Sequence, residues 1–180
     1  EEQSEDGEKT IILDGGVVFK GGKELCRVDD DGATAIFFMN DTPSEYSFTV
    51  PLGQNAKPSV MLIGVTRSIK ATEYNGKVKF DVTFSASGKI GSKGGIKEDD
   101  KKAAEKVAEP AERELKRKIE SSMIPIAEKG CDVFGLENTL RRCCNRFYRE
   151  NKDRVEEIIA ESEIEVNVNI DIFSQGIGGA

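Results

Sequence analysis

The chain has 180 residues, of which 37% are hydrophobic, and a formal net charge of −7 at neutral pH. This length fits one domain with a substantial hydrophobic core. The acidic balance argues against a nucleic-acid partner, because phosphate binding requires a basic field. The chain contains no histidine, which excludes His-based catalytic triads and most zinc and haem arrangements. We therefore expect neither a metal nor a cofactor.

The ends of the sequence indicate a fragment of a longer protein. It begins without Met and has no signal sequence and no apolar run of about 18 residues, so as given it neither crosses a membrane nor carries an export signal. We expect any targeting information upstream of Glu1. Residues 1–10 are predicted to be an acidic leader or linker, residues 11–176 the domain, and residues 177–180 a tail.

A β-hairpin is predicted near the start of the domain. Residues 11–19 have the composition of a strand that is interrupted by Gly15-Gly16. A turn at Gly21-Gly22-Lys23 leads into a second strand over residues 24–28.

An acidic stretch and a short apolar element follow this hairpin. Asp29-Asp30-Asp31-Gly32 resembles the start of a calcium loop, but the further oxygen ligands and the closing Glu are missing. A solvated turn or a helix N-cap is the better interpretation. Residues 33–39 form either a strand or a helix, in which we expect Phe37 and Phe38 to be mostly buried.

Three further strands are predicted over residues 47–52, 60–69 and 78–90. Tyr74-Asn75-Gly76 separates the last two, and Asn-Gly readily adopts the positive φ values of a tight turn. We therefore expect these two strands to be antiparallel neighbours. The glycine-rich residues 91–97 match neither spacing of a phosphate-binding loop and are predicted to be a linker.

The main helix is predicted to begin at Pro110, because proline is tolerated in the first turn of a helix and disfavoured inside one. Glu112 with Lys116 and Glu114 with Lys118 are spaced for ion pairs on a solvated face. The opposite face carries an apolar stripe that must meet a core, formed by Ala111, Leu115, Ile119, Met123, Ile126 and Ala127.

Shorter helices are predicted after the main helix. Pro125 is expected to kink its last turn and Gly130 to end it. Apolar residues recur at helical spacing over residues 136–148, which predicts a helix there. A further short helix is predicted over residues 155–159. The apolar positions of residues 136–148 are flanked by a basic cluster, which is either a solvated face or a docking patch for an acidic partner or lipid head groups: Arg141, Arg142, Arg146 and Arg149.

The closing strand over residues 164–172 carries the strongest local pattern in the chain. Apolar and polar side chains alternate, which indicates a strand buried on one face only. Its length of about 30 Å equals that of a 20-residue helix, so the main helix and this strand are matched to pack along each other. The apolar face is Ile164, Val166, Val168, Ile170 and Ile172, and the polar face is Glu165, Asn167, Asn169 and Asp171.

The cysteines are Cys26, Cys131, Cys143 and Cys144, and they show no paired C-x-x-C spacing. Free cysteine is among the most buried residue types, so we expect these four side chains to be buried and to pack as small hydrophobic groups. A weaker alternative is a thiol enzyme built on Cys143 or Cys144, with activation by Arg142 or Arg146. A normal thiol pKa would remove that alternative.

The predicted elements occur in a characteristic order. Gly16-Val17-Val18-Phe19-Lys20 precedes a turn and a second strand, a charged helix leads into Asp132-Val133-Phe134-Gly135, and an alternating strand ends near Gly176. This order resembles the C-terminal domain of the Ger(x)C family, the C subunits of nutrient germinant receptors of spore-forming bacteria. We interpret the motif residues as structural. Asp132 can accept backbone N–H bonds, Phe134 can fill the core, and Gly135 can adopt a conformation closed to other residues.

The resemblance implies a non-enzymatic subunit that acts in spore germination together with membrane-embedded A and B subunits. It also implies an exported lipoprotein, anchored by a lipidated cysteine on the outer face of the spore inner membrane. That cysteine would lie upstream of Glu1, so it is none of the cysteines in this chain. No enzymatic activity and no cofactor are implied.

We predict an α+β fold in which an antiparallel or mixed sheet is covered on one face by the long amphipathic helix, with shorter helices beside it. The candidate partner-binding residues are Arg141, Arg142, Asn167 and Asn169. The alternative function is a small-molecule, nutrient-binding module of an exported lipoprotein. In that case the polar side chains Asn167, Asn169 and Asp171 of the closing strand would contact the ligand.

Overall fold

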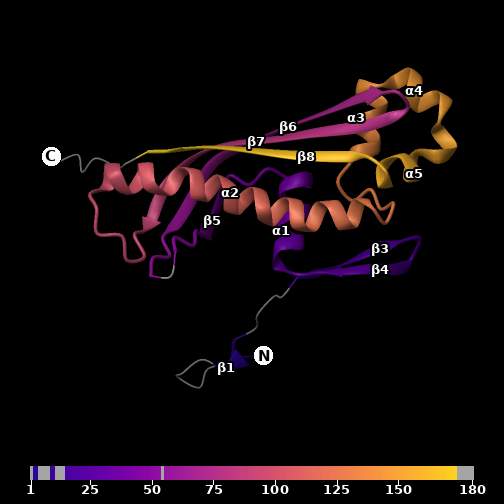
Figure 1. Ribbon diagram of the computed structural model, residues 1–180. Coiled ribbons are helices and arrows are strands. Elements are labelled where there is room, and N and C mark those ends of the chain that lie inside the picture. The colour runs from indigo at the N-terminus through magenta and orange to yellow at the C-terminus, as the bar shows by residue number, and fades with distance from the viewer. Residues whose placement is uncertain (1, 4–8, 11–14, 54, 174–180) are drawn as a thin grey trace.

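A four-stranded sheet forms the centre of the computed structural model, which describes residues 2–3, 9–10, 15–53 and 55–173 (Figure 1). The strands β5, β6 and β7 are antiparallel neighbours, and β8 pairs parallel to β7, so the sheet is mixed. This confirms the predicted α+β class. The sheet order is β5 (Glu45–Thr49), β6 (Ser59–Tyr74), β7 (Lys77–Ser92) and β8 (Glu163–Ile172).

The predicted hairpins are present. β3 (Gly16–Lys20) pairs antiparallel with β4 (Lys23–Val28), and the start predicted at Ile11 lies outside the described residues. The turn between β6 and β7 places Asn75 at φ 52° and Gly76 at φ 79°, as a tight Asn-Gly turn requires. Near the N-terminus, β1 (Glu2–Gln3) pairs with β2 (Lys9–Thr10).

The element left open as strand or helix is a helix, α1 (Asp30–Asn40). Asp29 is its N-cap, because the Asp29 carboxylate accepts a 2.9 Å hydrogen bond from the Gly32 amide. Phe38 is fully buried and meets Phe84 edge to face at 5.6 Å. The prediction that Phe37 is mostly buried is wrong, since it is 45% exposed. Neighbouring helical side chains diverge by about 100°, so only one of the two can face the sheet.

The main helix α2 (Asp100–Ala127) begins ten residues earlier than predicted and contains Pro110. The Asp99 carboxylate caps it through a 3.0 Å bond from the Lys102 amide. An internal proline costs about 3 kcal/mol, but the apolar stripe continues upstream of it. The added turns bury Ala103, Ala104 and Val107 in the core, and this burial offsets the cost of the proline.

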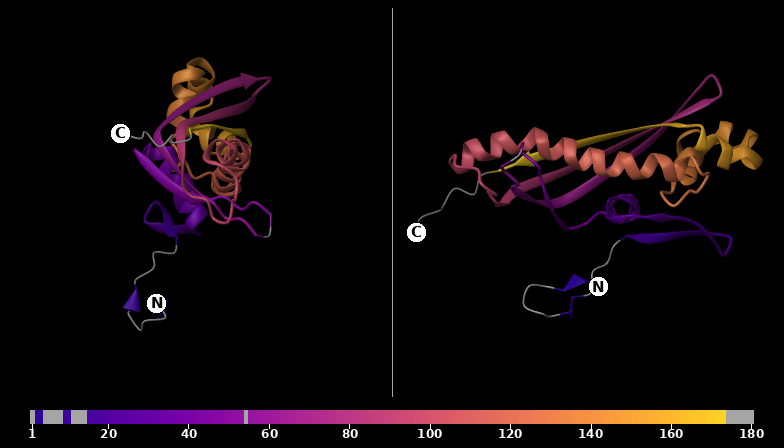
Figure 2. Two further views of the ribbon diagram at one scale, coloured as in Figure 1. Left: turned by 90° about the vertical axis from the view of Figure 1, so that its left-hand side faces the viewer. Right: turned by 60° about the horizontal axis from the view of Figure 1, so that its bottom comes forward.

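The helix α2 runs along β8 in the opposite direction, on one side of the sheet (Figure 2). The Glu112 carboxylate accepts a 2.8 Å hydrogen bond from the Ile170 amide, and the Glu120 carboxylate accepts a 3.4 Å bond from the Val166 amide. Eight helical residues rise about 12 Å and four strand residues about 13 Å. The two glutamates therefore match two outward N–H groups of this edge strand.

The polar side of α2 is not the simple solvated face that the sequence predicted. Glu114 pairs with Arg117 at 2.8 Å, and Lys118 pairs with Asp31 of α1. The side chains of Lys118 and Asp31 are only 17% and 20% exposed. These charges therefore attach α1 to α2, in addition to supporting the helix itself.

The segment after α2 contains α3 (Leu136–Cys143), α4 (Asn145–Glu150), a 3-10 turn (Lys152–Arg154) and α5 (Val155–Ala160). One helix over residues 136–148 was predicted, but it breaks at Cys144 (φ −126°, ψ 52°). The Cys144 thiol donates a hydrogen bond to the Ala71 carbonyl at 3.4 Å, so the break places this side chain in contact with β6. Lys20 connects the region to β3, through the Gly130 carbonyl at 3.0 Å and Glu156 at 2.6 Å.

Removing the carboxylate at Glu112 should destabilise the domain. We expect Glu112→Ala to lower the free energy of unfolding by about 1–2 kcal/mol, because the Ile170 amide loses a charge-assisted hydrogen bond. Urea denaturation measures this. Glu109→Ala, which removes only an exposed ion pair with Arg113, is the matched control and should cost under about 1 kcal/mol. Equal decreases in the free energy of unfolding of the two variants would show that the hydrogen bond from the Ile170 amide to Glu112 does not stabilise the domain.

The Asp31–Lys118 pair should make stability depend on pH. Burial raises the pKa of Asp31, but the hydrogen bonds and charges of Lys118 and Arg117 outweigh burial and hold that pKa below its ordinary value. Burial lowers the pKa of Lys118, but Asp31 outweighs burial and raises it. A lowered carboxyl pKa stabilises the fold above the unfolded value of about 3.9, and this stabilisation is lost as the pH falls through the folded pKa.

We expect Asp31→Asn to cost about 1–2 kcal/mol at pH 7. The difference from the native chain should shrink below about pH 4, and again above about pH 10.4 as Lys118 loses its proton through its raised pKa. Urea midpoints across this pH range check the expectation. A difference that stays constant from pH 7 down to pH 2.5 would contradict it.

Candidate functional site

The corner at residues 132–135 is a rigid connection between α2 and α3. Both Asp132 carboxylate oxygens accept backbone bonds, from Leu136 at 2.7 Å and from Glu137 at 2.8 Å. They satisfy two of the free N–H groups at the start of α3. Phe134 is 2% exposed, and Gly135 has φ 72°, a conformation that favours glycine.

A small polar pocket opens beside this corner, between α1, β6 and α3. Its volume is about 270 Å³. Asn40 fixes one wall, since its side-chain amide donates to the Val133 carbonyl at 2.7 Å and to the Ile36 carbonyl at 3.0 Å. The lining residues are Met39, Asn40, Arg67, Ile69, Phe134, Gly135, Asn138, Thr139 and Arg142. We call this cavity the corner pocket.

Two arginines line the corner pocket, Arg67 from β6 and Arg142 from α3. Arg67 donates to the Phe38 carbonyl at 3.3 Å and so caps the C-terminus of α1. Among the described residues, no carboxylate lies within ion-pair distance of either guanidinium, whereas Arg117 and Arg146 each pair with a glutamate. The pocket is therefore locally cationic in an acidic chain.

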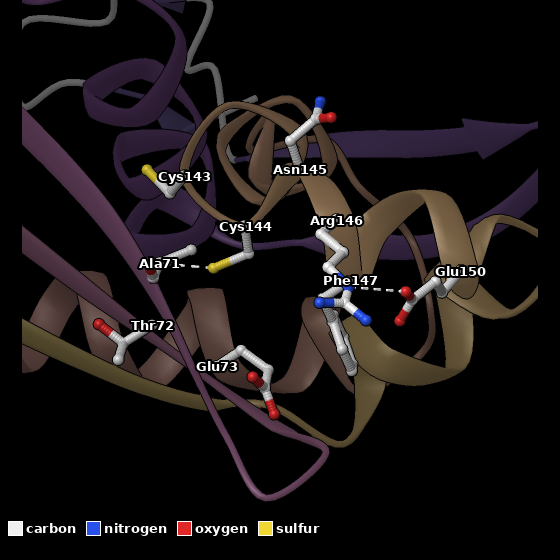
Figure 3. Close-up of a pocket in the computed structure, with 9 residues that line it drawn as sticks. All are labelled: Ala71, Thr72, Glu73, Cys143, Cys144, Asn145, Arg146, Phe147 and Glu150. Atoms are coloured by element: carbon white, nitrogen blue, oxygen red, sulfur yellow. Dashed lines mark hydrogen bonds and ion pairs between the residues drawn. The ribbon is translucent and has the colours of Figure 1, made fainter.

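A second cavity, of about 690 Å³, lies between the end of β6 and the start of α4 (Figure 3). Cys143, Cys144 and Arg146 line it together with Glu73. In Figure 3 the Arg146 guanidinium is joined to Glu150 by an ion pair of 2.9 Å, and the Cys144 sulfur points to the Ala71 carbonyl. Neither arrangement activates a thiol.

The prediction that the cysteines are buried is confirmed for some of them and wrong for one. Cys26 and Cys131 are buried, as expected for small hydrophobes, and Cys144 is half-buried. Cys143 is exposed, which contradicts the prediction, because the break after α3 places the side chain of Cys144, rather than that of Cys143, against β6. Burial raises the pKa of the Cys144 thiol, and burial likewise raises the pKa of Cys131. A raised pKa disfavours the thiolate that a cysteine nucleophile requires.

The polar residues of β8 lie on a different surface. The pairing of β6, β7 and β8 places Ser68, Thr83 and Asn167 in one row of the sheet. The next row consists of Thr66, Ser85 and Asn169. These side chains point away from the face on which α2 packs, and all are exposed or half-buried. We call this surface the polar sheet face.

One end of the polar sheet face is charged. Lys79 of β7 forms ion pairs with Glu165, with Asp81 at 3.4 Å and with Glu163 at 3.6 Å. The hydrogen bond to Glu165 raises the pKa of Lys79, and the same bond lowers the pKa of Glu165. This network ties the start of β8 to β7.

The predicted site residues therefore form two groups, not one. Arg142 joins Phe134 and Gly135 around the corner pocket, while Asn167 and Asn169 lie on the polar sheet face. Arg141 does not line the pocket and donates to the Asn138 side chain at 2.9 Å. Gly176 lies outside the described residues.

The comparisons with known proteins agree with this fold. Residues 14–176 match the family described as spore germination B3/GerAC like, C-terminal. The chain belongs to this family. The match to the B3/GerAC-like family covers the sheet, α2 and the corner alike.

A solved structure described as the crystal structure of the GerBC protein has a similar fold, with a TM-score of 0.77 at 17% sequence identity. The alignment covers 94% of this chain and 54% of GerBC, so the present chain spans about half of that protein. A search of curated proteins found no match.

Two features are absent from the described residues of the B3/GerAC-like domain. None of the described helices combines the length and apolar character needed to cross a bilayer. Within the same part of the chain, no three or more cysteine or acidic side chains gather in a way that could hold a metal ion.

Sequence reasoning missed Arg67 and Asn40 as pocket residues. A signal for Arg67 was present, because it occupies an inward position of β6 between the buried Val65 and the half-buried Ile69. A charged side chain at such a position is a departure from the apolar pattern. Asn40 had no comparable signal, since its partner Val133 is 93 residues away.

Truncating Asp132 should test the structural role of the family motif. We expect Asp132→Ala to lower the free energy of unfolding by about 1–2 kcal/mol, because two amides at the start of α3 lose their acceptor. Asp132→Asn keeps one side-chain oxygen and should lose less. Thermal or urea unfolding measures both variants. A loss below about 0.5 kcal/mol for Asp132→Ala would contradict a structural role.

Proposed function

We propose that this chain is the C-terminal domain of the C subunit of a nutrient germinant receptor. It acts in spore germination by binding the membrane-embedded A and B subunits and performs no catalysis. The full-length protein is held at the outer face of the spore inner membrane by a lipid anchor upstream of this domain. The observation that carries the proposal is the family match over residues 14–176.

The chemistry of the domain supports a role without catalysis. The half-buried Cys144 has a thiol pKa raised by burial, and its neighbour Arg146 is paired with Glu150. In the described part of the chain, the titratable groups with shifted pKa values lie in ion pairs or against the core, and Cys144 and Arg146, which share one cavity, contact separate partners. A catalytic site would gather such groups.

The polar sheet face is the surface that we assign to the partner subunits. Its hydroxyl and amide side chains, such as Ser85 and Asn169, can donate and accept hydrogen bonds across a flat area. The opposite face of the sheet is occupied by α2, and Glu112 and Glu120 occupy the outer edge of β8. A partner can therefore dock on the polar sheet face without displacing any described helix.

Bulky charged substitutions on this face should impair the nutrient response. Spores whose C subunit carries Ser85→Arg with Asn169→Arg should release dipicolinic acid more slowly after nutrient addition. Their response to a non-nutrient stimulus should stay normal. Ser121→Arg, an exposed position on α2, is the matched control and should respond like the native protein.

Immunoblots of spore membranes show whether each variant accumulates, and so they distinguish loss of the protein from loss of its contact with the partners. If the double variant accumulates normally and germinates at the native rate, the polar sheet face does not contact the partners. If spores that lack the whole subunit respond normally to every nutrient, the receptor assignment itself fails.

A further inference from the structure

The corner pocket has features that its structural role does not require. It lies between α1, β6 and α3, and its lining includes Arg67 and Arg142, neither of which has a carboxylate within ion-pair distance among the described residues. Like charges that share one cavity repel each other. An anion between them would remove this repulsion and supply the missing hydrogen-bond acceptors.

The remaining polar groups of the pocket complete a set of donors. The Asn138 side-chain oxygen accepts from Arg141 at 2.9 Å, which leaves the Asn138 NH₂ group free to donate. Within the described residues, the Arg67 side chain donates one hydrogen bond, to the Phe38 carbonyl, and this bond fixes its position. The side chain of Thr139, which is 4% exposed, is held by the Gly135 carbonyl at 3.3 Å.

We propose that the corner pocket binds a small oxyanion, held by Arg67, Arg142 and the Asn138 amide. Guanidinium groups match both carboxylate and phosphate through two parallel N–H bonds. The volume of about 270 Å³ limits the ligand to a small molecule. The site is distinct from the polar sheet face, and it does not depend on the receptor assignment proposed above.

Titrations of the ¹⁵N-labelled chain with acetate and, separately, with inorganic phosphate test this site. Ionic strength is held constant with sodium chloride, and the amide of Gly135 and the side chain of Asn138 are the reporters. We expect saturable shifts of these signals with one or both anions. Saturation by acetate alone identifies a carboxylate site, saturation by phosphate alone a phosphate site, and saturation by both a general oxyanion site.

Arg142→Gln should weaken this binding about tenfold or more, since a charge-assisted interaction is lost. Arg142 is exposed, so this variant should keep its fold, which the unshifted remainder of the spectrum reports. Arg149→Gln, another exposed arginine outside the pocket, is the matched control and should bind like the native chain. Absence of saturation with either anion, or equal weakening in the two variants, would overturn the proposal.

Discussion

The contact between α2 and the outer edge of β8 constrains the rest of the domain. An edge strand exposes N–H groups that invite pairing with another chain, and here the carboxylates of Glu112 and Glu120 accept two of them. Their spacing on the helix matches the spacing of Val166 and Ile170 on the strand. This match fixes both the direction and the register of α2 on the sheet. The buried stripe of the helix then meets the apolar face of the sheet, where Leu115 and Ile119 are almost fully enclosed.

The position of α2 on the sheet determines where the corner pocket and the polar sheet face lie. The end of α2 sets the start of the corner, where Asp132 begins α3 and Asn40 holds Val133 against α1. The corner pocket is the space left between α1, α3, the corner and β6. On the opposite side, the polar sheet face stays open because α2 covers only one face. The corner therefore caps the start of α3 through Asp132 and lines a cationic pocket through Phe134 and Gly135.

Local patterns in the sequence predicted much of this fold. The Asn75-Gly76 turn, the alternation of β8 and the apolar stripe of α2 each depend on neighbouring residues, so they could be recognised without tertiary structure. Two of the errors came from contacts at long range in the sequence. Burial upstream of Pro110 keeps α2 continuous, and the contact of Cys144 with Ala71 accompanies the break between α3 and α4. The corner pocket could not be predicted, because Arg67 and Arg142 are brought together only by the packing of α3 on β6.

Hydrogen exchange of the β8 amides tests the central contact most directly. The Val166 and Ile170 amides point away from β7, and without acceptors they would exchange rapidly with solvent. If Glu112 and Glu120 seal this edge, both amides should exchange as slowly as the Asn167 amide, which alternation directs toward β7. Rapid exchange at Val166 and Ile170 beside a protected Asn167 would show that the edge is open. In that case α2 is placed by its apolar stripe alone, and β8 becomes available to a partner strand.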